Sequence, residues 1–338
     1  MRTILASLLV LLGAGAAFAG NDPSPSRTQV EQLAVSLAAE LSRLCPPAPP
    51  GDQAAFDRCR QGLFKDSLLK RSLASHVLWG RPHKDPGARL KDTTLTQFAP
   101  DVLSGMYLSL FMFNGGHTLE YRPEEGLYRV TLDTAFRNRL APGQFPYPFW
   151  HDQAKWSAYQ SANSILLWID PKTEKVKVGQ FTDRGPTSPI VASEPVPQPK
   201  FDGKWLWTDA DGRLQPQVTL FDGLFGRDNP HLGKLDAAYR DFALKMRDAQ
   251  CLDCHVPNNP DKMNKLVLLQ SPAHAAGEIK RLMEAVRKDR MPRDEVGIEQ
   301  PLDEPLKRAL LERGAAFEAL IDAAKDWEKQ KEDSRTAR

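Results

Sequence analysis

The sequence lacks several features that would assign it to a common functional class. Lys and Arg number 45 against 43 Asp and Glu, a formal net charge of +2, so no excess of positive charge indicates a nucleic-acid partner. Beyond the N-terminal segment, no run is apolar enough to cross a membrane. The chain contains no HExxH or GxSxG motif and no glycine-rich phosphate-binding loop. The informative features that remain are the N-terminus and the four cysteines.

The N-terminal residues have the pattern of a secretory signal peptide. Arg2 supplies a positive charge, an apolar run follows, and Ala17 and Ala19 frame an A-x-A cleavage site. We therefore predict a signal peptide over residues 1–19. The apolar run is shorter than the about 20 residues of a membrane-spanning helix, which disfavours an uncleaved anchor. The mature protein is expected in the periplasm, with no stable membrane insertion.

Residues 20–232 are predicted to form an α+β domain of unknown role. Apolar residues at helical spacing and Asp52, a suitable N-cap, indicate helices in its first part. Helices are expected at residues 28–44, from 53 onward, at 95–113 and at 152–162. Strands are expected at residues 127–132, 164–169, 175–181, 204–208 and 217–220. The proline-rich segment 183–200 is expected to be irregular.

From Leu235 the chain becomes strongly helical, up to about Lys329. We place the domain boundary before residue 233, with an all-α domain over 233–330 and a polar, frayed tail over 331–338. The predicted fold class is therefore an α+β domain followed by an all-α domain.

Cys45 and Cys59 form the first cysteine pair. The segment CPPAPPG ends the first helix, so Cys45 lies at the end of one helix and Cys59 inside the next. Because an exported compartment permits disulfides, we predict a disulfide that clamps this helical hairpin.

The second pair, Cys251-Leu-Asp-Cys254-His255, has four competing interpretations. A structural zinc site would need a second ligand pair, which the sequence lacks. A thioredoxin-type pair starts a helix inside a βαβ unit, whereas this pair follows a helix. A plain disulfide leaves His255 unexplained. Covalent haem attachment accounts for all three residues, because the thiols add to the porphyrin vinyl groups and the imidazole is the proximal iron ligand.

Residues 233–328 resemble the small helical monohaem c-type cytochrome domains. The resemblance implies one covalent haem c, a helix leading into the motif, a terminal helix packed across it, and electron transfer to a redox partner protein. The leading helix offers an apolar face of Leu235, Ala238, Tyr239, Phe242, Met246 and Ala249. The terminal helix offers Leu310, Phe317, Leu320, Ile321, Ala324 and Trp327.

The same resemblance implies a methionine, often followed by proline, as the second axial ligand. Met291 in Arg290-Met291-Pro292-Arg293 fits, with a predicted helix at 276–288 between it and His255. The alternatives are Met263, Met283, His274 and an open sixth site.

Two histidines upstream of the motif have no assigned role. His117 ends the glycine-rich corner Asn114-Gly115-Gly116-His117, and His151 ends the aromatic cluster that begins at Pro146. A glycine turn and a proline-stiffened aromatic corner packed on the sheet account for these features better than a catalytic or ligand-binding pocket does, and whether His117 or His151 is functional stays open.

Two functional hypotheses follow. In the first, the protein is an electron carrier with His255 and Met291 as axial ligands. In the second, it is a periplasmic haem enzyme or sensor, in which the upstream domain oxidises or binds a small substrate or the haem keeps an open sixth site. The two differ in whether Met291 occupies the iron.

Overall fold

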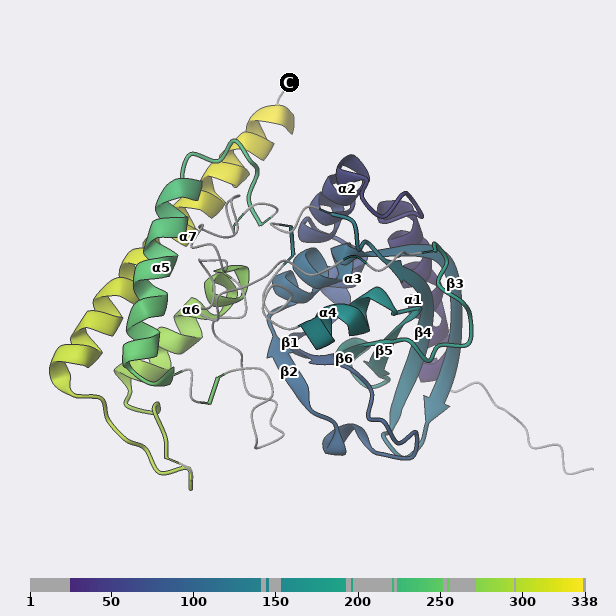
Figure 1. Ribbon diagram of the computed structural model, residues 1–338, viewed down its shortest axis with the longest axis horizontal. Coiled ribbons are helices and arrows are strands. Elements are labelled where there is room, and N and C mark those ends of the chain that lie inside the picture. Colours follow the sequence, from purple (N-terminus) through teal and green to yellow (C-terminus); the bar gives the residue numbers. More distant parts are fainter. Residues whose placement is uncertain are drawn as a thin grey trace, which may run out of the picture.

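The structure, a computed structural model, is shown in Figure 1. It describes residues 25–140, 144–145, 153–192, 196, 221, 224–251, 254–255, 272–294 and 296–336. The predicted signal peptide, the hairpin at 204–208 and 217–220, Met263 and His151 lie outside these residues, as does the side chain of His274. None of the described helices combines the length and apolar character that a membrane crossing requires.

The N-terminal helices form the predicted clamped hairpin. The helices are α1 (Pro25–Leu44), α2 (Gln53–Phe64) and the short α3 (Leu68–Ser72). The Asp52 carboxylate caps α2 by accepting a hydrogen bond from the Ala55 amide at 2.9 Å. The Cys45–Cys59 disulfide is present and confirms that prediction. Both sulfur atoms are buried in the core cluster that α1 and α2 share with the sheet.

The centre of the α+β part is a six-stranded sheet of order β2-β1-β6-β5-β4-β3. The strands are β1 (Leu73–Gly80), β2 (Leu95–Phe98), β3 (Phe111–Arg122), β4 (Leu127–Phe136), β5 (Ser164–Asp170) and β6 (Lys175–Thr182). Neighbouring strands pair antiparallel except β1 and β6, which are parallel. The strands predicted at 127–132, 164–169 and 175–181 are confirmed, and α4 (Gln153–Gln160) matches the short helix predicted beside them.

The helix predicted over residues 95–113 is wrong. That segment holds β2, a π-helical turn η2 (Val102–Tyr107), a 3-10 turn η3 (Leu108–Leu110) and the start of β3. The physical reason is that the segment is mostly apolar, and periodicity cannot distinguish a buried strand from a buried helix in such a run. Tertiary packing decides, since Phe98, Tyr107 and Phe111 are all fully buried in the core.

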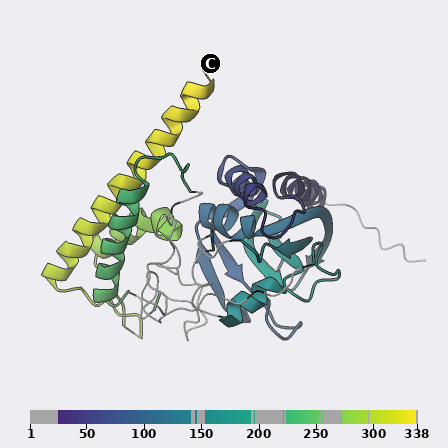
Figure 2. The ribbon, with the colours of Figure 1, turned by 45° about the horizontal axis from the view of Figure 1, so that its top comes forward.

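The C-terminal region is helical, as predicted, and has its own buried cluster. It consists of α5 (Leu232–Asp248), α6 (Pro272–Arg287) and α7 (Glu304–Thr336). Figure 2 shows α7 as a long helix running past the end of α5. It continues to Thr336, so the predicted helix end near Lys329 is too early and the tail predicted at 331–338 is not frayed where it is described. The domain boundary before residue 233 stays a prediction.

Helix α6 connects the helical region to the α+β part (Figure 1). The Arg281 guanidinium donates a hydrogen bond to the Gln97 side chain at 3.1 Å. His76 Nε2 of β1 lies 3.6 Å from the carboxylate of Glu278, which is buried at 4 % exposure. These two polar contacts of α6 therefore join the helical region to the α+β part.

Candidate functional site

The second cysteine pair begins where α5 ends. Ala249 follows Asp248, the last residue of the helix, and donates its amide to the Lys245 carbonyl at 2.9 Å. Gln250 then adopts a left-handed backbone with a φ of 55° and donates its amide to the Arg247 carbonyl. A left-handed residue at this position is a common way to end an α-helix. The chain leaves the axis of α5 immediately before the motif.

Cys251 and His255 are brought together by a single backbone turn. The His255 amide donates to the Cys251 carbonyl at 3.1 Å, an i to i+4 hydrogen bond that closes one helical turn. Residues at this spacing lie on the same side of a turn. Cys254 lies inside the turn, and it and Cys251 carry thiols and do not form a disulfide with each other. Cys251, Cys254 and His255 are thus contiguous in space.

This turn is attached to the apolar cluster of the three C-terminal helices. Cys251 packs against the cluster, and Cys251, Cys254 and His255 are all half-buried. Two thiols able to form thioethers and one imidazole able to bind iron therefore lie at the boundary between a dry interior and solvent. The residues fit a covalently attached haem, which needs both the sulfur atoms and a ligand beside them.

The cluster beside the turn contains a group of packed aromatic rings, here called the aromatic cluster. The Phe317 ring of α7 lies 5.9 Å from both Tyr239 and Phe242 of α5, measured between ring centroids. Burial raises the pKa of the Tyr239 phenol, so that side chain is neutral. At Gly314 of α7, an added Cβ would lie 2.0 Å from Met283 Sδ and 3.2 Å from the Phe242 ring. The absence of a side chain there lets the helices approach closely and exclude water from the cluster.

The candidate distal ligand, Met291, lies on a separate loop. Helix α6 ends at Arg287, and the Arg290 amide donates to the Ala285 carbonyl at 2.9 Å before the loop begins. The Met291 side chain is 37 % exposed, whereas Met283, one of its rivals, is 2 % exposed in the core. Of these two methionines, Met291 is the more exposed.

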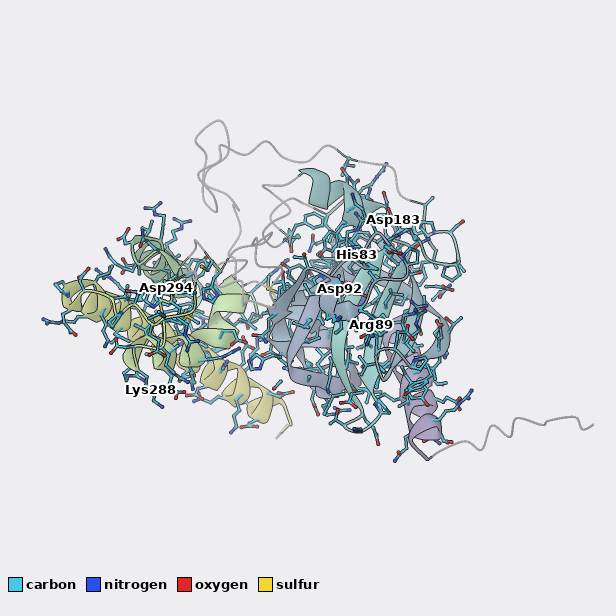
Figure 3. The ribbon with its side chains drawn as sticks, turned by 90° about the horizontal axis from the view of Figure 1, so that it is seen from below. His83, Arg89, Asp92, Asp183, Lys288 and Asp294 are labelled. Atoms are coloured by element: carbon cyan, nitrogen blue, oxygen red, sulfur yellow. A yellow bond between two sulfur atoms is a disulfide. The ribbon has the colours of Figure 1, made fainter. Side chains whose placement is uncertain are left out.

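The loop after Met291 is organised by Asp294 (Figure 3). The Asp294 carboxylate accepts hydrogen bonds from the amides of Val296 at 3.1 Å and Ile298 at 2.8 Å. The Asp294 amide donates to the Ile298 carbonyl at 2.9 Å. The hydrogen bond from the Ile298 amide, with smaller contributions from the Gln300 side chain and the Val296 amide, holds the pKa of Asp294 below its usual value. The loop that presents Met291 therefore has a defined conformation.

The glycine-rich corner before His117 differs from its predicted form. It lies inside β3, where the register with β4 shifts between Phe113 and His117, and it does not follow a helix. Gly115 has a φ of 89°, and the Asn114 side chain accepts a hydrogen bond from the Gly116 amide at 2.8 Å. The segment is a strand bulge, which needs glycine for its backbone conformation. His117 Nδ1 lies 3.0 Å from the Gly115 carbonyl oxygen.

Arg137 is a residue that the sequence analysis did not single out. It directly follows β4, and its side chain is fully buried. No sequence signal marks it, because an arginine at the end of a strand is ordinarily exposed.

In the part of the chain that the structure describes, no group of three or more His, Cys, Asp or Glu side chains is arranged to hold a metal ion. Comparison of the chain with protein-family models, with curated proteins and with solved structures found no match. The functional assignment therefore depends on the residues of the site itself.

Proposed function

We propose that this protein is an exported monohaem c-type cytochrome that transfers electrons through a haem c attached to Cys251 and Cys254. The observation that carries the proposal is the closed turn from Cys251 to His255, placed against the aromatic cluster of α5 and α7. The signal peptide predicted at residues 1–19 supports the proposal from the sequence, because haem attachment of this kind takes place on the exported side of the membrane. The electrons would pass to or from a redox partner protein.

Each residue has one role in this proposal. The Cys251 and Cys254 thiols form the two thioethers, His255 is the proximal ligand, and Met291 is the distal ligand. Haem, when bound, supplies an iron that changes its oxidation state by one electron. The chain excludes water with the aromatic cluster and positions His255 through the backbone bond to Cys251. Helices that are already packed have little need to reorganise when the charge changes.

Replacing both thiols tests the attachment. The Cys251→Ser/Cys254→Ser variant is expected to lose covalent haem completely, because a hydroxyl does not form the thioether. The measurement is haem staining per mole of protein after electrophoresis under denaturing conditions, with the intact mass of the mature chain as a second readout.

The matched control is Cys45→Ser/Cys59→Ser, which removes the same number of sulfur atoms from the other pair. It is expected to lose about 3 kcal/mol of stability, the contribution of a disulfide that closes a loop of this size, and to keep haem on every surviving molecule. Staining that persists without Cys251 and Cys254, or that disappears equally from the control, contradicts the proposal.

A further inference from the structure

Arg137 buries a whole guanidinium group that has no hydrogen-bond partner among the described residues. Its side chain is 0 % exposed, and Nε, Nη1 and Nη2 are all buried without an acceptor. The backbone around it is satisfied, since the Arg137 amide donates to the Leu110 carbonyl at 2.8 Å. A guanidinium carries five N–H donors, so an entire charged head group lacks acceptors.

Burying a charged group of this kind costs folding free energy unless an opposite charge or hydrogen bonds compensate it. Burial lowers the pKa of Arg137 to about 10, against the attraction of Asp52 and together with the repulsion of Arg58. The guanidinium is therefore still charged at neutral pH. The fold encloses a cation that forms no side-chain hydrogen bond with the described residues.

Asp52, whose negative charge attracts Arg137, already has a hydrogen-bond partner elsewhere. The Asp52 carboxylate caps α2 through the Ala55 amide at 2.9 Å. Arg58, one turn and a half further along α2, adds positive charge. The segment 138–151, which follows Arg137, contains neither Asp nor Glu. The second carboxylate of α2, that of Asp57, pairs with Arg60 and Arg227, and the adjacent chain supplies none.

The chain after Arg137 lies directly against the start of α2. A Cβ added at Gly51 would lie 3.0 Å from the Arg139 carbonyl oxygen, so only glycine permits this approach without displacement. The N-terminus of a helix carries a partial positive charge. The Asp52 carboxylate already lies at that helix end, and the buried guanidinium and Arg58 favour a second anion in the same region.

We propose that Arg137 is the centre of a binding site for a small carboxylate anion between the end of β4 and the first turns of α2. A carboxylate offers two coplanar oxygens, which match two parallel N–H groups of a guanidinium. The proposal goes beyond electron transfer and is independent of it, because it gives the α+β part a ligand of its own.

The test uses the full-length haem-loaded protein after exhaustive dialysis. Sodium acetate replaces sodium chloride at constant ionic strength, and the protein is unfolded and refolded at each concentration so that a buried site can fill. Unfolding of the sheet is followed by far-UV circular dichroism. Each tenfold rise in acetate above the dissociation constant is expected to raise Tm by about 3–6 °C.

Two variants locate the effect. Arg137→Met keeps an unbranched apolar stem without charge and is expected to lose the response to acetate. Arg71→Met, which removes a 54 % exposed arginine from α3, is expected to keep it. In wild-type protein, acetate is also expected to slow amide exchange in residues 53–64 and 137–140, which supports the site even when Arg137→Met does not fold.

Three results overturn the proposal. One is a Tm and an amide exchange pattern that acetate leaves unchanged in wild-type protein. A second is an acetate response that Arg137→Met retains. The third is an equal rise in Tm with phosphate replacing acetate, which identifies a general anion site and not a carboxylate site. None of these results bears on haem attachment, so the two proposals fail separately.

Discussion

At the scale of single residues, Met291 and Met283 show how burial separates two chemically identical side chains. Met283 Sδ fills the space opposite Gly314 and belongs to the helical core. Met291 is 37 % exposed on the loop after α6, where its sulfur is available for another contact. A thioether ligand favours ferrous iron and raises the reduction potential. Because Met283 is buried in the helical core and Met291 is exposed, Met291 is the one of these two methionines that we expect to bind the iron of the proposed haem.

Met291→Ala is expected to lower the reduction potential and to let carbon monoxide bind the ferrous iron, because the sixth position is vacated. The measurements are a potentiometric titration and the visible spectrum with and without the gas. Met283→Leu serves as the control, since a swap of similar volume in a core is usually tolerated, and it should change neither readout. If Met291→Ala leaves the potential and the spectrum unaltered, the ligand is another residue. Carbon monoxide binding to the wild-type protein would favour the enzyme or sensor hypothesis.

At the scale of elements, the carboxylate of Asp294 makes several of the hydrogen bonds in the loop of residues 289–300. Asp294 accepts the amides of Val296 and Ile298, and these side chains are 80 % and 61 % exposed. Apolar packing therefore contributes little to the loop, and hydrogen bonds hold it. Because the pKa of Asp294 is depressed in the folded protein, its stabilising contribution is present above the unfolded-state pKa. It is lost as the pH falls through the lower, folded-state pKa.

Asp294→Ala is expected to increase amide exchange at Val296 and Ile298 several-fold at neutral pH while leaving α6 and α7 protected. The same two amides in the wild-type protein should lose protection, after correction for intrinsic rates, as the pH falls below the folded-state pKa of Asp294. Asp326→Ala on the exposed side of α7 is the control. Equal protection in Asp294→Ala and wild type would show that the carboxylate does not organise the loop.

The elements also show where local sequence signals suffice. Asp52 and the CPPAPPG segment act on their immediate neighbours, so the start of α2 and the Cys45–Cys59 clamp could be predicted. Residues 95–113 lack such signals, and the packing of α1, α2 and the sheet around them determines their mixed conformation. A bulge inside β3 likewise resembles a turn in the sequence, because both need glycine at a positive φ.

At the scale of the whole molecule, the two parts of the chain meet through α6. Glu278 is 4 % exposed and faces His76 of β1, while Arg281 reaches Gln97 of β2. The loop that carries Met291 follows α6 directly. A displacement of α6 against the sheet would therefore also move the loop that carries Met291, the proposed distal ligand.

A double-mutant cycle of His76→Ala and Glu278→Ala measures this connection. We expect a coupling free energy of about 0.5–1.5 kcal/mol, because the two side chains are in contact and one of them is buried. The comparison pair is Arg81 and Asp183, an exposed pair 3.0 Å apart whose coupling should be at the lower end of that range. Chemical unfolding of the four proteins in each cycle provides the values. If the destabilisation of the double variant equals the sum of the two single variants within about 0.3 kcal/mol, the contact between His76 and Glu278 does not couple the two parts.

The sequence by itself determined the features that depend on neighbours along the chain. These are the N-cap of α2, the cysteine pairing in the first hairpin, strands β5 and β6, and the contiguity of Cys251, Cys254 and His255, which are too close in sequence to be separated by folding. Only the tertiary structure decided the burial of Arg137 and the exposure of Met291. Both depend on which distant segments pack against a residue, and that choice follows from the apolar surface of the whole fold.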